Sequence, residues 1–162
     1  MSQFRVVREY PHSVAKVWRV LTDPELMPLW TSTGRGGRPE GFSPTVGTKF
    51  QFVAKPVAGW RGIVDCEVVA VDAPHSLRFT WVGDEGERPS VVSYRLEPTA
   101  DGTRLTYEHT GFTGLGGFFM ARLLGSVRRK MLSVGVPAVL DAVDEQGRLR
   151  PGHDLKPKPL AG

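Results

Sequence analysis

The stretch that decides the fold class is DGTRLTYEHTGF, residues 101–112, read with the helical pattern that follows it. Asp101-Gly102 is a tight-turn dipeptide between two alternating runs, and it suits a type I′ hairpin turn, which needs positive φ at both central residues. Alternate residues of a strand share one face. After the turn, one face therefore carries Leu105, Tyr107 and His109. A closing hairpin followed by one long helix predicts a sheet that grips a helix.

The long helix is predicted to begin near Leu115 and to run for roughly 25–30 residues. Its basic residues are expected mostly on solvated faces, and these are Arg122, Arg128, Arg129 and Lys130. Pro137 removes one helical hydrogen bond, so we expect a kink near residues 132–135. An apolar stripe at helical spacing, flanked by Met120, is expected to face the sheet and consists of Phe119, Leu123, Val127, Met131 and Val134.

The rest of the chain reads as one strand, two short helices and further strands. Residues 4–10 alternate and are predicted to form a strand, and Ser13 is a candidate N-cap of the first helix. Asp23-Pro24 is predicted to begin a second helix, with Asp23 as its cap and Pro24 at its first position. Residues 33–44 are predicted to be a loop. From residue 46 onward the pattern has period two and predicts strands at residues 46–54, 62–71, 77–82, 92–96 and 103–110. The predicted fold class is α+β, with a curved antiparallel six-stranded sheet wrapped around the C-terminal helix and two short helices between the first two strands.

Length and composition place limits on the function. A chain of 162 residues fits one domain, predicted at residues 1–146, with a flexible, basic, proline-rich tail at residues 147–162. Much of the net charge of +4 lies in that tail, which argues against nucleic-acid binding. The single cysteine, Cys66, and the lack of an apolar leader favour the cytoplasm. No run reaches the ~18–20 apolar residues of a membrane span, so no stable membrane insertion is expected, and we expect a monomer or weak homodimer.

Several blocks together resemble a known superfamily. They are VWRVLTDP at residues 17–24 with Trp30, VG at 46–47, VDAPHSLRFTW at 71–81, DGTRLT at 101–106 and HTGF at 109–112. In their order and spacing they resemble the START-like, helix-grip superfamily (SRPBCC, the birch pollen allergen type). Within it, the chain is most similar to the branch of proteins like the activator of heat-shock-protein ATPase, with polyketide cyclases as relatives. The resemblance implies a cavity under the long helix and members that bind lipids, hormones or polyketides, cyclise chains or assist a chaperone.

The predicted ligand-binding residues are those that would line such a cavity. They are Trp30, Phe50, Phe52, Glu67, Phe79, Trp81, Tyr94, Tyr107 and His109 from the sheet and short helices, and Phe119, Met120, Leu123 and Val127 from the long helix. Aromatic residues of this kind are more often plain core, although in this fold the same residues serve both purposes. The tyrosine hydroxyls could bind a ligand while their rings pack.

The catalytic residues are unknown, with His109 and Glu67 as candidates. A neutral imidazole on an inward face could bind a ligand or act as an acid or base, but a histidine satisfied within the core is the simpler reading. Asp65 and Glu67 share a face of their strand. An inward carboxylate there would have a raised pKa and could pair with His109, whereas an outward face or a bulge would prevent this.

No cofactor or metal is predicted. The glycine-rich residues 34–37 are not followed by the Lys-Ser/Thr of a phosphate-binding loop. The 4 histidines fall in separate segments without ligand spacing, and no Gly-x-Ser-x-Gly element is present.

Three functions are consistent with these residues. The first is binding of a small apolar or aromatic molecule between sheet and helix. The second is a cyclase or hydrolase in which His109 meets Glu67, Asp65 or Tyr94 in an open pocket. The third is a protein-interaction role, as a chaperone helper or stress-response partner, which predicts an exposed apolar patch outside the cavity.

Overall fold

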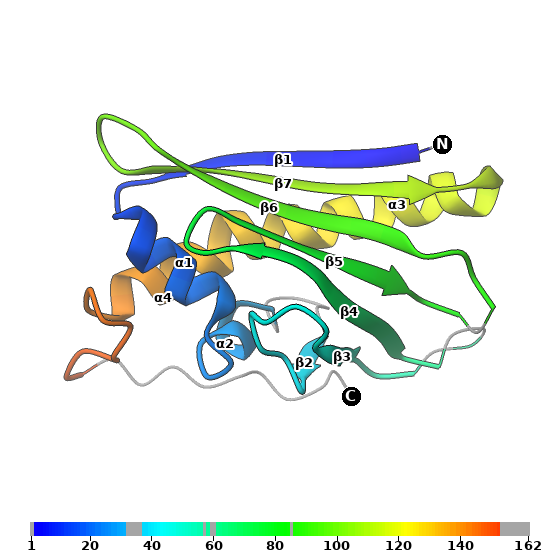
Figure 1. Ribbon diagram of the computed structural model, residues 1–162, viewed down its shortest axis with the longest axis horizontal. Coiled ribbons are helices and arrows are strands. Elements are labelled where there is room, and N and C mark those ends of the chain that lie inside the picture. The colour runs from blue at the N-terminus through cyan, green and yellow to red at the C-terminus, as the bar shows by residue number, and fades with distance from the viewer. Residues whose placement is uncertain (1, 32–36, 57, 59–60, 85, 153–162) are drawn as a thin grey trace.

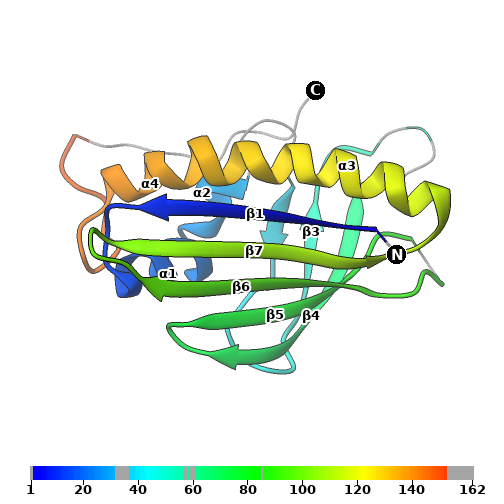
Figure 2. The ribbon, with the colours of Figure 1, turned by 90° about the horizontal axis from the view of Figure 1, so that it is seen from above.

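The computed structural model describes residues 2–31, 37–56, 58, 61–84 and 86–152. One antiparallel sheet runs through the molecule in the order β1-β7-β6-β5-β4-β3-β2. Its strands are β1 (Ser2–Tyr10), β2 (Arg38–Glu40), β3 (Lys49–Val53), β4 (Ile63–Asp72), β5 (Ser76–Val82), β6 (Ser90–Pro98) and β7 (Thr103–Phe112). The first strand of the chain pairs with the last, so β1 forms one edge of the sheet (Figures 1 and 2).

The helices lie on one face and at one end of this sheet. The short helices α1 (Val14–Thr22) and α2 (Met27–Thr31) connect β1 to β2, and the long C-terminal helix consists of α3 (Gly114–Lys130), a π-helical turn η1 (Met131–Gly135) and α4 (Val136–Ala142). The long helix runs alongside β1, and α1 and α2 lie near its α4 end (Figure 2). The α+β helix-grip prediction is confirmed.

The predicted strand number of six was low because β2 was assigned to a loop. Residues Arg38 to Glu40 pair with β3 in the register Arg38↔Val53, Pro39↔Phe52 and Glu40↔Gln51. A strand of three residues is too short to show an alternating pattern, and its proline and the glycine that follows are typical of loops. Only the neighbouring strand makes this segment extended.

Of the two predicted helix starts, the one at Ser13 is confirmed and the one at Asp23 lies too early in the chain. Ser13 caps α1 as predicted, because its side-chain oxygen accepts a hydrogen bond of 3.2 Å from the backbone N–H of Lys16. Asp23 accepts from the N–H of Glu25 at 2.8 Å, but the α-helix begins only at Met27.

The hairpin between β6 and β7 is present, but its turn is not the predicted type. The backbones of Thr99 and Gly102 bond to each other, which leaves Ala100 and Asp101 as the central residues, and neither has a positive φ. Gly102 is needed for another reason, because a Cβ there would overlap the carbonyl oxygen of Tyr10. The glycine therefore permits a close approach of β1 rather than a left-handed turn.

The long helix presents a different side to the sheet from the one predicted. Phe119 and Leu123 are 61% and 56% exposed, and Met120 and Val134 also face outward. Of the predicted stripe, Met131 is buried and Val127 is half-buried, and the other residues on the buried side are Ala121, Gly125, Arg128 and Leu132. The reason is close packing: a Cβ on Gly125 would lie 3.3 Å from the Phe4 ring. Small residues let α3 approach β1. A search for large apolar residues at helical spacing does not identify such positions.

The irregularity predicted near residues 132–135 is the π-helical turn η1, directly before Pro137 in α4. A π turn holds one extra residue, so it shifts the face that the following helix presents. After η1 the helix is more deeply buried, with Val136, Val139 and Leu140 in the core.

The C-terminal segment folds back on α4. The backbone N–H of Arg150 donates to the Ala142 carbonyl at 2.8 Å, and Val143 bridges to Leu149. The remainder of the predicted tail, residues 153–162, lies outside the described residues. Among the helices that the structure describes, none is both long and apolar enough to cross a membrane.

Candidate functional site

The predicted aromatic residues form one buried cluster on the helix-facing side of the sheet. Their ring centroids lie close together: Phe50 is 5.3 Å from Phe79, and Tyr94 is 5.3 Å from Tyr107. All are buried, and the set comprises Trp30, Phe50, Phe52, Phe79, Trp81, Tyr94 and Tyr107. The sequence therefore located the core side chains correctly, and in this structure they pack mainly on one another.

His109 lies inside the same cluster and is 1% exposed. Its Nε2 is 2.7 Å from the hydroxyl oxygen of Ser90, which itself donates to the Trp81 carbonyl at 3.3 Å. Because the Ser90 hydroxyl donates its proton to that carbonyl, its oxygen can only accept from His109. His109 therefore donates its Nε2–H to Ser90. Burial, reinforced by the charge of Arg128, lowers the pKa of His109 to about 3. The ring is therefore neutral at physiological pH, and a weak base.

Asp65 and Glu67 lie on the opposite face of the sheet from His109. The core-facing residues of β4 are Val64, Cys66 and Val68, and the β-bulge comes only after Val68. Asp65 accepts hydrogen bonds from Gln51 at 2.8 Å and Arg61 at 2.6 Å, which hold the pKa of its carboxyl below the usual range. The outward alternative is therefore the correct one, and neither carboxylate reaches His109.

Glu67 instead lines a hollow on that outer face. The hollow has a volume of about 560 Å³ and is bordered by Lys49, Gln51 and Thr80 among others. Of the nine described residues that line it, six carry polar or charged side chains, and the other three are Phe50, Cys66 and Val82. Among the described residues, no group of three or more His, Cys, Asp or Glu side chains is placed to hold a metal ion.

Arg128 is the residue that sequence reasoning missed. It was expected on a solvated face, but it is 3% exposed and points into the aromatic cluster. Its guanidinium carbon lies 5.0 Å from the centroid of the Phe52 ring and 5.4 Å from that of Trp81. The signal that could have identified it is its spacing of three from Gly125 and seven from Ala121, the small residues of the inward face.

Two buried tyrosine hydroxyls in this cluster, those of Tyr94 and Tyr107, meet no partner at full hydrogen-bond geometry among the described residues, although the Tyr107 hydroxyl lies close to the Arg128 guanidinium. Burial raises the pKa of both phenols, and Arg128 opposes that rise. Burial also raises the pKa of the Cys66 thiol, so this cysteine is protonated and unreactive. Buried polar atoms are nearly always bonded, so these hydroxyls need an explanation.

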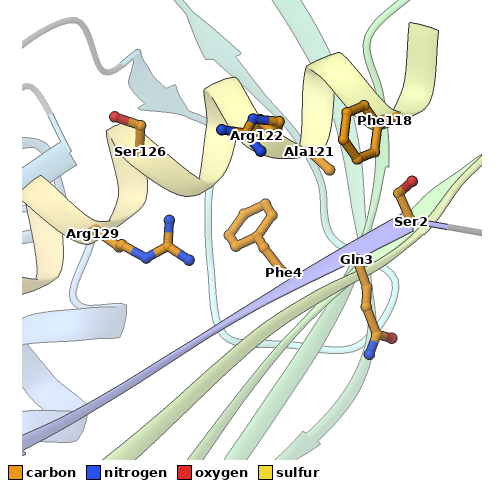
Figure 3. A pocket seen from close by; sticks show the side chains of 8 residues that line it. All are labelled: Ser2, Gln3, Phe4, Phe118, Ala121, Arg122, Ser126 and Arg129. Carbon is orange, nitrogen blue, oxygen red and sulfur yellow. The ribbon is translucent and has the colours of Figure 1, made fainter. Parts of the chain in front are cut away.

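A second hollow lies between β1 and α3 and measures about 520 Å³ (Figure 3). The ring of Phe4 rises from β1 toward the helix, whereas Gln3 points away from it (Figure 3). Eight residues line it: Ser2, Gln3, Phe4, Phe118, Ala121, Arg122, Ser126 and Arg129. None of them was among the predicted ligand-binding residues, because the hollow exists only through the pairing of the N-terminal strand with the C-terminal helix.

Comparison with solved structures identifies the same fold in other proteins. Protein MLL2253 from Mesorhizobium loti is 29% identical, with a TM-score of 0.74 over 88% of this chain and 99% of that one. CalU16 from Micromonospora echinospora is 22% identical, with a TM-score of 0.61 over 83% of this chain and 75% of that one. DynU16, a putative protein in the dynemicin biosynthetic locus, is 22% identical, with a TM-score of 0.67 over 86% of this chain and 47% of that one.

No curated protein matches the chain in sequence. A family model does: the one described as "Activator of Hsp90 ATPase homolog 1-like protein" matches residues 11–118. That span contains the α1 and α2 helices and ends in the first turns of α3. Domains of this START-like superfamily typically bind hydrophobic ligands. The match covers most of the chain, and the protein therefore belongs to the family of Activator of Hsp90 ATPase homolog 1-like proteins, within the START-like superfamily.

Proposed function

We propose that this domain binds a small apolar or aromatic molecule, such as a lipid or polyketide, between β1 of the sheet and the long helix. The observation that carries the proposal is the hollow of about 520 Å³ between β1 and α3. Ligand sites commonly have volumes of about 300–1,000 Å³. The floor of this hollow is apolar, with Phe4, Phe118 and Ala121, and its cationic side chains come from Arg122 and Arg129.

The packing of α3 supports the same location. In α3 the buried side is made by Ala121, Gly125 and Arg128, so the helix contributes small side chains where it meets β1, and the Phe4 ring of β1 lies against Gly125. Burying roughly 300 Å² of apolar ligand surface at about 25 cal/mol/Å² gives a gross ~7.5 kcal/mol before entropic costs. Apolar contact alone therefore supports affinities no tighter than micromolar.

Filling the hollow tests this function. Ala121→Phe places a ring in the hollow, and Ala138→Phe is the matched control on an exposed position of α4. In the wild type and the control, a panel of aromatic and lipid compounds should raise the melting temperature, and native mass spectrometry should detect a ligand retained from expression. Ala121→Phe should lose both signals; because Ala121 also packs against β1, circular dichroism must show a wild-type fold before that loss is attributed to the filled hollow. If no compound shifts the wild-type protein, the proposal is wrong.

A protein-interaction function is supported by a separate observation, the exposed apolar side chains of α3. Large apolar side chains on the outward side of α3 are 44% to 73% exposed and form a patch made of Leu115, Phe118, Phe119, Met120 and Leu123. Exposed apolar patches of this kind mark interaction surfaces. The patch supports a protein-interaction role of the kind the family name describes, namely stimulation of an Hsp90-type chaperone ATPase.

The ATPase assay separates this role from ligand binding. Phe119→Ser with Leu123→Ser should abolish stimulation, whereas Val46→Ser with Val69→Ser, which removes exposed apolar residues elsewhere, should leave it unchanged. Stimulation that survives the first double variant would exclude the α3 patch. Absence of stimulation by the wild type would exclude the role itself.

The enzymatic alternative receives less support. Its proton shuttle required an acid beside His109, and both candidate carboxylates lie on the other face of the sheet. His109 is bonded to Ser90 and has a pKa of about 3, far from the value suited to acid–base catalysis near neutral pH.

A further inference from the structure

Arg128 is a charged side chain that is almost completely buried, 3% exposed, between the long helix and the sheet. Its one hydrogen bond of full geometry among the described residues runs from Nη1 to the Met131 sulfur, at 3.3 Å, and its guanidinium also lies close to the Tyr107 hydroxyl. A guanidinium carries five N–H donors, and a thioether is a weak acceptor. A buried charge is ordinarily paired, and no carboxylate among the described residues forms an ion pair with Arg128.

Aromatic rings surround this cation on several sides. The guanidinium carbon lies 5.0 Å from the ring centroid of Phe52, 5.4 Å from that of Trp81 and 5.8 Å from that of Tyr107. Ring faces attract a cation, but they accept none of its hydrogen bonds in the plane of the guanidinium. The rings therefore hold Arg128 in place while its in-plane donors remain available.

Two further donors lie beside Arg128. Tyr94 and Tyr107 are directly paired residues on β6 and β7, and both hydroxyls are buried; among the described residues that of Tyr94 has no partner and that of Tyr107 has only the nearby Arg128 guanidinium. Arg128 acts electrostatically on both phenols, which places the three groups in one neighbourhood. The phenols stay protonated because burial raises their pKa. The cluster thus presents a positive charge and two hydroxyl donors, and none of its three members offers a negative charge in return.

Phe4 separates this cluster from the hollow between β1 and α3. Its ring lines the hollow and lies 5.9 Å from the Tyr107 ring and 5.4 Å from the His109 ring. A ligand group that reaches Arg128 from the hollow must therefore displace the Phe4 ring. Among the described residues, the lining of the hollow is positive, with Arg122 and Arg129 and no acidic side chain.

We propose that the ligand of this domain is an amphipathic anion, whose carboxylate or similar oxyanion is bound by Arg128, Tyr94 and Tyr107 and whose apolar or aromatic remainder occupies the hollow beside Phe4. This inference rests on the proposed function and specifies its ligand class. A carboxylate accepts two parallel hydrogen bonds from a guanidinium and more from hydroxyls, which matches the unused donors. The attraction between the carboxylate and Arg128 would also make binding tighter than the micromolar affinity that apolar contact alone supports.

A matched pair of probes tests the proposal: biphenyl-4-carboxylate and biphenyl-4-carboxamide, which differ in charge and little in shape. By isothermal titration calorimetry at pH 7.5, the wild type should bind the carboxylate at least tenfold more tightly than the carboxamide. Arg128→Met should reduce the carboxylate affinity to the carboxamide level and leave the carboxamide affinity unchanged. Lys130→Met, which removes a positive charge from an exposed position of the same helix, should preserve the preference.

Two more variants locate the oxyanion. Tyr94→Phe with Tyr107→Phe removes both hydroxyls and should reduce the carboxylate preference severalfold. The double variant Arg122→Gln with Arg129→Gln should reduce the affinity for the carboxylate probe less than Arg128→Met does. If the preference is lost in this double variant and kept in Arg128→Met, the anion lies at the hollow and the interior site is wrong.

The outcomes distinguish this inference from the proposed function. Equal wild-type affinity for both probes would overturn the anion site and leave the apolar-binding function standing. This measurement needs no variant, so it remains decisive even if Arg128→Met fails to fold. Binding of neither probe, or of any other apolar compound, would overturn both.

Discussion

At the scale of single residues, burial decides what each polar group does. His109 and Arg128 occupy the same apolar interior, yet the imidazole becomes neutral while the guanidinium keeps its charge, because arginine cannot be deprotonated in a protein. The charge of Arg128 then lowers the pKa of His109 further. A lone histidine in a strand therefore acts as a neutral hydrogen-bonding residue, and the positive charge near it comes from Arg128 of the long helix.

The neutral state of His109 predicts a pH dependence of stability. Folded His109 has a pKa of about 3, against the ordinary value of 6.5 in the unfolded chain. Between these values the unfolded state binds more protons, so the free energy of unfolding falls as the pH is lowered. The slope from this group approaches ~1.4 kcal/mol per pH unit below pH 6.5.

Chemical denaturation between pH 7 and pH 4 measures this slope. His109→Gln keeps an N–H donor for Ser90 and removes the titration, so its stability should fall less steeply than that of the wild type. His75→Gln, at an exposed position, should follow the wild-type curve. Parallel curves for wild type and His109→Gln would show that His109 does not carry the effect.

At the scale of elements, close backbone contacts set the arrangement of β1 against its neighbours. Gly125 lets α3 approach Phe4 of β1, and Gly102 lets the β6–β7 turn approach Tyr10 at the other end of the same strand. Neither position has a positive φ. Both glycines are therefore required for space rather than for backbone freedom, and they place β1 where one wall of the hollow is formed.

A pair of glycine substitutions tests this role. Gly102→Ala forces the turn away from Tyr10 and should lower the free energy of unfolding by roughly 2–3 kcal/mol. Gly116→Ala, where a Cβ would meet nothing within 4 Å, should leave stability unchanged or raise it by up to ~1 kcal/mol through helix propensity. Equal effects at the two positions, measured by urea unfolding, would contradict the argument from space.

At the scale of the whole molecule, the two halves of the long helix differ. After the π-helical turn, α4 is anchored in the core by Val136, Val139 and Leu140, and α1 and α2 pack against it. Before it, α3 lies against β1 through small residues and exposes a row of large apolar ones. The hollow, the buried Arg128 and the exposed patch all belong to this less tightly packed half, so both proposed functions depend on the same part of the helix.

The sequence by itself determined the fold class. Period-two alternation, turn residues and one long helical run predicted the sheet, the two short helices and their order. The inward positions of Phe50, Phe79, Tyr94, Tyr107 and His109 followed from the same periodicity, since each strand has only two faces. Family blocks spread along residues 17–112 led to the superfamily that the family match supports.

Tertiary structure alone decided the site. A helix can turn any of its sides to a sheet, and here the side was chosen by Ala121 and Gly125, whose small size allows contact with β1. That choice buried Arg128, exposed Phe119 and opened the hollow beside Phe4. The outward direction of Glu67 was likewise settled by strand register. Local patterns fix periodicity, whereas the side that faces inward depends on partners far away in the chain.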